Sequence, residues 1–218
     1  MLERALATWT FDFAQVYGLT ETGGAITYLT PADHRSGNRE RLRSCGRVLR
    51  QADIRVVDAH GEVVPAGTAG EVVCRSPQNM QGYWRRDAER VLGDGWLRTG
   101  DVATLDADGY LFVHDRLDDM IVSGGENVYP SEVESVLTAH PAVADAGVVG
   151  VPDGRWGSRI VAFVVLAPGA AATADDLDTF LRGRIASFKV PKTITFVPAL
   201  PRNAAGKLLR RELRASAT

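Results

Sequence analysis

The chain has 218 residues, of which 45% are hydrophobic and 24% charged, the balance of a globular protein with a buried core. The net charge is only −2, so the totals give no reason to expect a nucleic-acid-binding protein. No apolar run of about 18 residues appears and no basic stretch precedes an apolar one, so no transmembrane segment or signal peptide is predicted and the cytoplasm is the expected location.

Residues 1–16 carry apolar side chains without a clear period and begin abruptly, as the end of a larger unit would. The run Tyr17-Gly-Leu-Thr-Glu-Thr-Gly-Gly24 that follows is predicted to be a loop, because its glycines interrupt regular structure. It presents Thr20 and Glu21, whose oxygens suit phosphate groups and a hard metal ion. A polar turn that binds no ligand explains the same residues.

Residues 46–76 have the apolar runs and turn residues of short strands. Strands are expected at 52–57 and at 70–74, with a turn at 59–62 between them. Cys45 and Cys74 stand alone, without the paired spacing of a zinc site or a disulfide framework. This part of the chain is therefore predicted to be a small β-rich unit.

A short helix is predicted at 87–92, followed by strands at 102–105 and 110–114. Asp101 stands just after a glycine, at the start of the first of these strands. A carboxylate in that position can accept two hydrogen bonds from a vicinal diol such as that of ribose. Asp101 is therefore a candidate ligand for a nucleotide.

The charged run 115–119 has no core-forming pattern and is expected to be a flexible joint. Gly124 and Gly125 follow it, and because they lack a Cβ they allow another molecule to approach the backbone. An ordinary connection from a strand to a helix is the alternative interpretation.

Beyond the joint the pattern alternates between helices and strands, which predicts an α+β domain of about 100 residues. A helix is expected at 131–139, with Pro130 in its first turn and a capping box made by Ser131 and Glu134. A second helix is expected at 173–185, with Thr173 and Asp176 at its start. The strands expected here are 143–151, 160–166 and 193–197.

The last 37 residues, 182–218, hold nine Lys or Arg and one Glu, a local charge of +8 that leaves −10 for the remainder. Such a basic end indicates a phosphate-bearing ligand or an acidic partner, and a solvated basic face is the simpler alternative. No aromatic residues alternate with these charges, so nucleic acid is not an expected partner. The loop 201–207 ends in Lys207, which follows a glycine and can reach a phosphate or a carboxylate as a point charge.

Taken together and in this order, these motifs resemble those of the adenylate-forming superfamily, which includes acyl-CoA synthetases, aryl-CoA ligases, peptide-synthetase adenylation domains and luciferases. The resemblance implies a β-rich remnant of a large N-terminal AMP-binding domain at 1–114, a hinge at 115–118 and a small mobile C-terminal α+β domain at 119–218. The motifs that carry it are 17–24, 70–83, 95–101, 115–134 and 201–207.

The resemblance also implies the chemistry, in which a carboxylic acid and Mg-ATP give an acyl-adenylate, and the thiol of coenzyme A then displaces AMP. Lys207 would contact the substrate carboxylate and the α-phosphate during the first step. The remaining assignments for that step are Tyr17 against adenine, Thr20 at the α-phosphate, Glu21 at Mg²⁺, and Asp101 with Arg116 at the ribose hydroxyls.

For the second step, the resemblance implies that the small domain turns about Asp118. Gly124 and Gly125 would then line a tunnel for the pantetheine arm of coenzyme A, where a Cβ would be in the way. Trp156 and Phe188 resemble positions that lie beside coenzyme A in aryl-CoA ligases, although ordinary core packing also explains a tryptophan. The basic C-terminal segment would suit the phosphates of coenzyme A.

Members of the superfamily also carry an upstream phosphate loop with a lysine and most of the acid-binding pocket, which residues 1–218 do not contain. The chain is therefore expected to be a C-terminal portion of an acyl- or aryl-CoA ligase that is inactive by itself. Residues 1–45 would then pack poorly or pair with a second copy. The alternatives are an adenylation domain that acts with a carrier protein and a non-catalytic module that binds nucleotide, coenzyme A or a partner.

Overall fold

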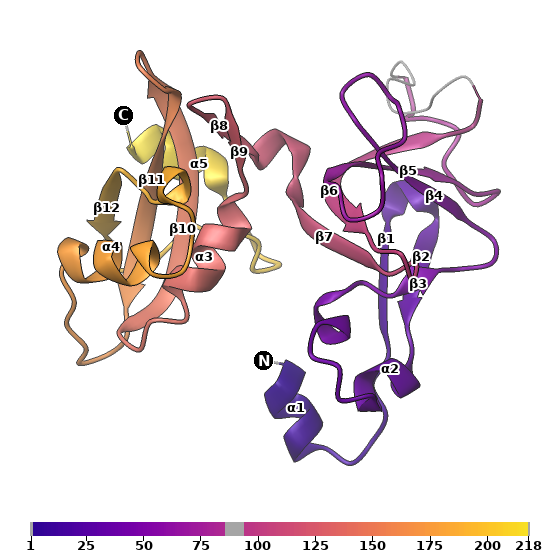
Figure 1. The fold of residues 1–218 in the computed structure, drawn as a ribbon, viewed down its shortest axis with the longest axis horizontal. Coiled ribbons are helices and arrows are strands. Elements are labelled where there is room, and N and C mark those ends of the chain that lie inside the picture. Colours follow the sequence, from indigo (N-terminus) through magenta and orange to yellow (C-terminus); the bar gives the residue numbers. More distant parts are fainter. Residues whose placement is uncertain (1, 86–93, 218) are drawn as a thin grey trace. The chain divides into compact units, whose positions relative to one another are not determined.

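The computed structural model describes residues 2–85 and 94–217, so the helix predicted at 87–92 lies outside the described part. The chain divides into two compact units, one ending at Leu117 and the other beginning at Asp118 (Figure 1). This division falls inside the segment 115–118 that the sequence analysis assigned to a hinge. The rotation expected at the hinge stays a prediction, and each unit is described by itself below.

The first unit begins with a small antiparallel sheet in the order β1-β2-β3, formed around the motif at 17–24. Ile26 and Leu29 of β2 are fully buried, and the Thr27 hydroxyl donates to the Cys45 carbonyl at 2.6 Å. The elements of this part are α1 (Leu2–Thr8), β1 (Gln15–Leu19), the 3₁₀ turn η1 (Thr20–Thr22), β2 (Gly24–Leu29), α2 (Pro31–Arg35), η2 (Arg41–Arg43) and β3 (Arg47–Val48).

The expectation that residues 1–45 pack poorly fits much of this segment, whose described residues are mostly exposed or half-buried, but it is wrong for β2. Ile26 of β2 is buried because it packs against Cys74 and Ala52. The start of the segment fits the expectation most clearly: the ring centroids of Trp9 and Phe11 are 5.4 Å apart, and the two residues are 53% and 61% exposed.

The second sheet of this unit is antiparallel in the order β4-β5-β6-β7. Its core is formed by Val56, Val72, Ala103 and Leu111, each from a different strand. The four strands predicted here are confirmed, with β6 beginning five residues earlier than expected. The bounds are β4 (Asp53–Val57), β5 (Gly70–Arg75), β6 (Leu97–Leu105) and β7 (Leu111–Arg116).

The run 115–119 is not flexible throughout, which corrects the sequence analysis. Asp115 and Arg116 continue β7 and pair with Val102 and Asp101 of β6. The sequence pattern missed this extension because the side chains of this edge strand are charged rather than apolar. A 3₁₀ turn, η3 (Leu117–Asp119), follows the strand and contains the boundary between the units.

The second unit is built on a sheet in the order β10-β11-β12, with β10 and β11 antiparallel and β11 and β12 parallel. Along β10, Val148 faces the core shared with α3 and α4, whereas Val149 faces the core shared with α5, as a period of two requires. The elements are β8 (Ile121–Ser123), β9 (Glu126–Val128), α3 (Pro130–Leu137), β10 (Val143–Asp153), β11 (Gly157–Leu166), α4 (Ala174–Arg182), η4 (Ser187–Lys189), β12 (Thr193–Phe196) and α5 (Arg210–Ser216).

The predicted α+β fold is confirmed, as are the strands and the two helices expected in this unit, and one detail of capping differs. Thr173 caps α4 by accepting from the Asp176 amide at 3.2 Å, as expected. Helix α3 instead starts after Tyr129 without a side-chain cap, with Pro130 in its first turn. The Ser131 and Glu134 capping box is therefore wrong, because Glu134 is used elsewhere: it accepts from the Val148 amide at 2.8 Å.

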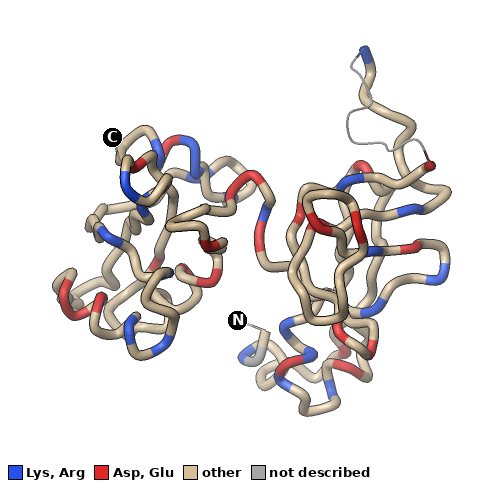
Figure 2. Tube along the Cα trace, turned by 45° about the horizontal axis from the view of Figure 1, so that its top comes forward, with Lys and Arg blue, Asp and Glu red and all other residues tan. Residues whose placement is uncertain are grey.

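Figure 2 marks the charged residues along both units. Five of the nine basic residues in 182–218 pair with acidic side chains of the described part of the chain, at the partners Asp178, Glu132, Asp145, Glu134 and Asp119. The +8 segment is thus partly neutralised within its own unit. Within residues 2–85 and 94–217, no helix combines the length and apolar character needed to cross a membrane.

Candidate functional site

Asp101 lies at the centre of a polar network in the first unit. It is 5% exposed and stands directly opposite Arg116 across the β6–β7 pair. Its Oδ1 is 2.9 Å from Arg116 Nε, and its Oδ2 accepts a hydrogen bond from the Tyr17 hydroxyl at 2.6 Å. Since each carboxylate oxygen has a second lone pair, Asp101 can still accept two further hydrogen bonds, as a ribose diol would require.

The pairing of β5 with β6 is irregular beside Asp101. The register between β5 and β6 shifts between Glu71 and Val73 of β5, opposite this part of β6. The Thr99 hydroxyl donates to the Val72 carbonyl at 2.8 Å and accepts from the Asp101 amide at 3.1 Å. The buried Glu71 pairs with Arg98. Asp101 therefore lies in an irregular part of β6 whose backbone and neighbouring side chains are hydrogen-bonded.

The environment of Tyr17 keeps its hydroxyl protonated. Burial, followed by the hydrogen bond to Asp101, raises the pKa of the Tyr17 phenol far above its ordinary value. The neutral hydroxyl is therefore a permanent donor to Asp101 rather than a competing anion. The predicted contact of the Tyr17 ring with adenine stays a prediction.

The motif at 17–24 and the motif at 70–83 meet in the structure. The Tyr83 hydroxyl donates to Glu21 Oε1 at 2.6 Å, and the Met80 amide donates to the Glu21 carbonyl at 2.8 Å. Gly23 ends the η1 turn with φ of 66°, and a Cβ at this position would lie 2.4 Å from the Gln78 carbonyl oxygen. The glycine is thus required by the close contact of the two motifs.

Thr20 and Glu21 are the candidates for phosphate and metal binding in this unit. Thr20 is exposed, and Glu21 is half-buried. Among the described residues, no three His, Cys, Asp or Glu side chains gather into a metal site. A magnesium ion at this position would fit only as Mg²⁺ usually binds, through one or two carboxylates together with phosphate oxygens and water.

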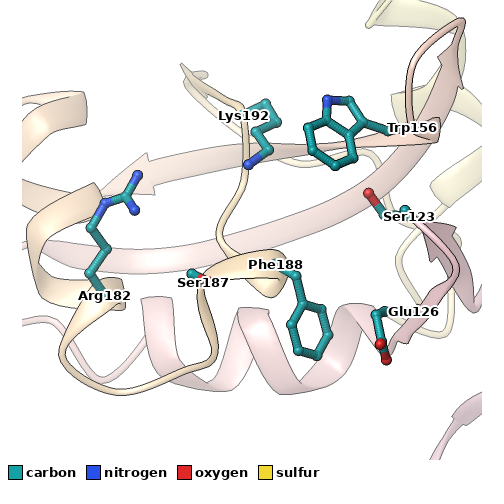
Figure 3. Close-up of a pocket in the computed structure, with 8 residues that line it drawn as sticks. Ser123, Glu126, Trp156, Arg182, Ser187, Phe188 and Lys192 are labelled. Atoms are coloured by element: carbon teal, nitrogen blue, oxygen red, sulfur yellow. The ribbon is translucent and has the colours of Figure 1, made fainter.

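The second unit contains a pocket of about 260 Å³ that brings together three of the predicted coenzyme A residues (Figure 3). These are Gly124, Trp156 and Phe188, whereas Gly125 lies outside the lining. The two rings are 39% and 37% exposed, so they are available to a ligand rather than buried in a core. The full lining is Ser123, Gly124, Glu126, Trp156, Arg182, Ser187, Phe188 and Lys192.

Glycine is needed at the two positions of the predicted tunnel for different reasons. Gly124 has φ of 62°, and a Cβ there would lie 3.1 Å from Trp156 Cε3. Its amide also donates to the Trp156 carbonyl at 2.9 Å, which fixes the loop against the indole. Gly125 has φ of 85°, but a Cβ on it would meet open space. Gly124 is thus needed for close packing, and Gly125 only for its backbone conformation.

Sequence reasoning missed Lys192, which lines the same pocket. Its Nζ lies 5.6 Å from the centroid of the Trp156 ring, within the range of a cation–π contact. Four basic residues of the +8 segment have no ion pair within the described part of the chain: Arg184, Lys192, Lys207 and Arg211. A signal was present in the sequence, because Lys192 is one of only three lysines in the chain, all after residue 188.

Lys207 stands at the end of a loop with a fixed backbone. Asn203 Oδ1 accepts from the Lys207 amide at 2.8 Å, and Arg202 donates to the Gly206 carbonyl at 2.8 Å while pairing with Asp145 at 2.7 Å. The Lys207 side chain itself is exposed. The loop therefore presents a single charge from a rigid base. Asp118, the predicted pivot, is likewise exposed.

Comparison with known protein families gives two matches that together span most of the chain. Residues 1–84 match the AMP-binding enzyme family, and residues 132–207 match the AMP-binding enzyme C-terminal domain. The two matches lie on either side of the unit boundary at Leu117.

Individual relatives extend this result. A fatty acid–acyl-carrier-protein ligase of Streptomyces coeruleorubidus is 46% identical over 98% of the chain, and a 2-succinylbenzoate–CoA ligase of Bacillus cereus is 47% identical over 92%. The chain spans about two fifths of the length of these relatives, 41% and 40%.

Solved structures show the same likeness. The o-succinylbenzoate CoA synthetase of Bacillus subtilis, in complex with its acyl-adenylate intermediate, has a TM-score of 0.87 and 40% identity over 98% of this chain and 43% of its own. An amide bond synthetase of Marinactinospora thermotolerans has a TM-score of 0.89 and 41% identity over 100% of this chain and 44% of its own.

Proposed function

The chain belongs to the adenylate-forming, AMP-binding enzymes, and from this premise we propose that it is the C-terminal portion of an ATP-dependent carboxylic acid–CoA ligase. One observation carries the proposal: a buried carboxylate with acceptor capacity for a diol, Asp101, precedes the unit boundary, and a pocket with exposed rings follows it. The two half-reactions use ATP and a thiol in turn, so the enzyme needs one site for the nucleotide and another for the thiol. The cofactors of this proposal are ATP, which yields AMP, Mg²⁺ and coenzyme A.

In the first half-reaction, the carboxylic acid attacks the α-phosphate of ATP and pyrophosphate leaves. Asp101 accepts hydrogen bonds from the ribose hydroxyls, and Arg116 holds the Asp101 carboxylate in place. Thr20 contacts the α-phosphate, and Glu21 contributes a carboxylate to Mg²⁺. Lys207 stabilises the negative charge that redistributes between the substrate carboxylate and the phosphate.

In the second half-reaction, a thiol attacks the acyl carbon of the adenylate and AMP leaves. A rotation of the second unit at Asp118 moves Lys207 away from the adenylate. The thiol then binds in the pocket beside Gly124. The pantetheine arm passes along Gly124 and Gly125, with Trp156 and Phe188 beside it. Lys192 adds a positive charge at the pocket, which suits the phosphates of coenzyme A.

A carrier-protein thiol is the second candidate acceptor, because one relative of this chain is named as a fatty acid–acyl-carrier-protein ligase. The pantetheine arm is common to coenzyme A and to carrier proteins, so the pocket would accept either. Two observations favour coenzyme A: the form Ser123-Gly-Gly-Glu-Asn-Val-Tyr-Pro130 of the loop and the unpaired Lys192 at the pocket. Lys192 would pair with a phosphate of the nucleotide part of coenzyme A.

We also propose that residues 1–218 alone do not catalyse the reaction, since they span about two fifths of the length of their relatives. Pyrophosphate release from ATP, measured on this chain with a panel of carboxylic acids, checks this. Sustained turnover would contradict it.

Calorimetry of this chain with AMP tests the nucleotide site. Asp101→Asn should weaken AMP binding about tenfold or more, because a hydrogen bond to a charged group contributes ~1.5 to 3 kcal/mol. Asp53→Asn is the matched control, since Asp53 is an exposed carboxylate of the same sheet that pairs with Arg75. Equal AMP affinity in Asp101→Asn and in the unchanged chain would remove Asp101 from the proposal.

A further inference from the structure

Two arginines of the C-terminal helix α5 hold the first residues after the unit boundary. Arg214 Nη2 lies 3.0 Å from Asp119 Oδ1 and donates to the Asp118 carbonyl at 3.5 Å. Arg210 Nε lies 3.4 Å from the other oxygen of Asp119. The Asp119 side chain is only 22% exposed, so both of its oxygens face basic groups rather than water alone. Asp118, one residue earlier, keeps its side chain exposed.

Arg210 is in turn fixed to the core of the second unit. Its guanidinium pairs with Glu134 of α3, and it donates to the Val148 carbonyl of β10 at 3.1 Å. Glu134 also accepts from the Val148 amide at 2.8 Å, which closes the network. The side chains of Arg210 and Glu134 are 13% and 17% exposed, and a pair this buried is costly to break by removing one partner.

Helix α5 connects this network to the loop that carries Lys207. Arg210 is the third residue after Lys207, and the Leu209 amide between them donates to the Pro201 carbonyl at 2.9 Å. Leu213 of α5 is 3% exposed and packs so closely on β10 that a Cβ on Gly147 would lie 2.8 Å from its Cδ1. A continuous set of rigid contacts therefore runs from Asp119 to Lys207.

We propose that Arg210 and Arg214 are positioning residues, which hold Asp119 to α5 so that a turn at Asp118 moves Lys207 as part of one rigid body. The contacts hold the chain from the Asp118 carbonyl onward, which leaves the proposed turn to the backbone between Leu117 and Asp118. Without them, Asp119 and the residue after it would join the flexible segment, and the position of Lys207 would vary. We call the contacts of Asp119 with Arg210 and Arg214 the clamp. The consequence for catalysis rests on the proposed function, whereas the clamp itself does not.

The clamp is tested on this chain by amide hydrogen exchange of residues 119–121. Arg214→Gln and Asp119→Asn should each raise the exchange rate there about threefold to fivefold, the effect expected of a partly exposed ion pair. Arg211→Gln is the matched control, because Arg211 is an exposed arginine of the same helix. Exchange no faster than in Arg211→Gln would overturn the clamp. Arg210→Gln is less informative, since Arg210 also supports the core.

The effect on Lys207 is tested in the full-length enzyme that carries these residues. Arg214→Gln should lower kcat for adenylate formation about threefold to fivefold, in step with its effect on exchange, without changing KM for ATP, because the ribose contact at Asp101 lies in the first unit. Arg214→Lys should restore most of the rate. An unchanged kcat, or a loss that only follows the amount of folded protein, would overturn the positioning role. If the unchanged enzyme adenylates no carboxylic acid, the proposed function fails, and the exchange experiment still decides on the clamp.

Discussion

The two units present their candidate groups in opposite ways. In the first unit Asp101 is 5% exposed, and each of its oxygens already has a protein partner, Arg116 or Tyr17. In the second unit Lys207 is exposed, and the rings of Trp156 and Phe188 are more than a third exposed. Under the proposed function, a carboxylate held by neighbouring strands would suit a ribose that stays bound through both steps, whereas Lys207 and the two rings, which are used in one step each, would remain at the surface.

The largest expected effect is that of Lys207→Ala, and it would sharpen this comparison. The change should reduce adenylate formation in the full-length enzyme by about 100- to 1000-fold, since one preorganised charge contributes ~3 to 4 kcal/mol to a transition state. Stability should not change, because the side chain is exposed. Pyrophosphate exchange and urea unfolding measure the two effects.

The control for that experiment is Arg211→Ala, which removes an exposed positive charge of the same segment. It should leave adenylate formation unchanged. If Lys207→Ala and Arg211→Ala lower the rate equally, the net charge of the segment matters and not the position of Lys207.

A smaller effect is expected from an alanine at the pocket. Gly124→Ala should cost about 1 kcal/mol of stability or more, because φ is 62° and the new Cβ would approach Trp156 Cε3 to 3.1 Å. Coenzyme A affinity, measured by calorimetry on this chain, should fall with it. Gly169→Ala is the matched control: its φ of 75° imposes a similar strain, but its Cβ would meet open space and Gly169 does not line the pocket. Equal losses of coenzyme A affinity in the two variants would show that strain alone matters.

The smallest expected effect concerns pH and the buried network. Because burial and Asp101 raise the pKa of Tyr17 in the folded chain, the folded state keeps a proton that the unfolded chain releases near pH ~10. The stability from this proton is complete below that pH and is lost as the pH rises further. In Tyr17→Phe the loss of unfolding free energy above pH ~10 should therefore be smaller, as urea unfolding at several pH values would reveal. A parallel decline in both proteins would exclude Tyr17 as the cause.

The sequence predicted the fold well where local chemistry determines it. Thr173 and Asp176 form the expected cap because an N-cap needs only residues close in sequence. The Ser131 and Glu134 cap failed because Arg210, 76 residues away from Glu134, competes for the same carboxylate. A contact between such distant residues leaves no local pattern.

The candidate site shows the same limit. The family motifs identified Asp101, Gly124 and Lys207 as candidates, but nothing in the sequence revealed that Tyr17 and Asp101 share a hydrogen bond across 84 residues. The clamp at Asp119 was missed for a related reason. Its arginines stand in a run of basic residues, where the ones that bind an acidic partner look the same as those that face solvent.

The unit boundary has a consequence for protein engineering. The ion pair between Asp101 and Arg116 lies before Leu117, and the pairs of Asp119 with Arg210 and Arg214 lie after it. If two relatives were joined at the peptide bond between Leu117 and Asp118, each half of the chimera would keep its own network complete. Relatives with different acid specificities could then exchange their C-terminal units at this peptide bond, and each unit would bring its own anchoring contacts into the chimera.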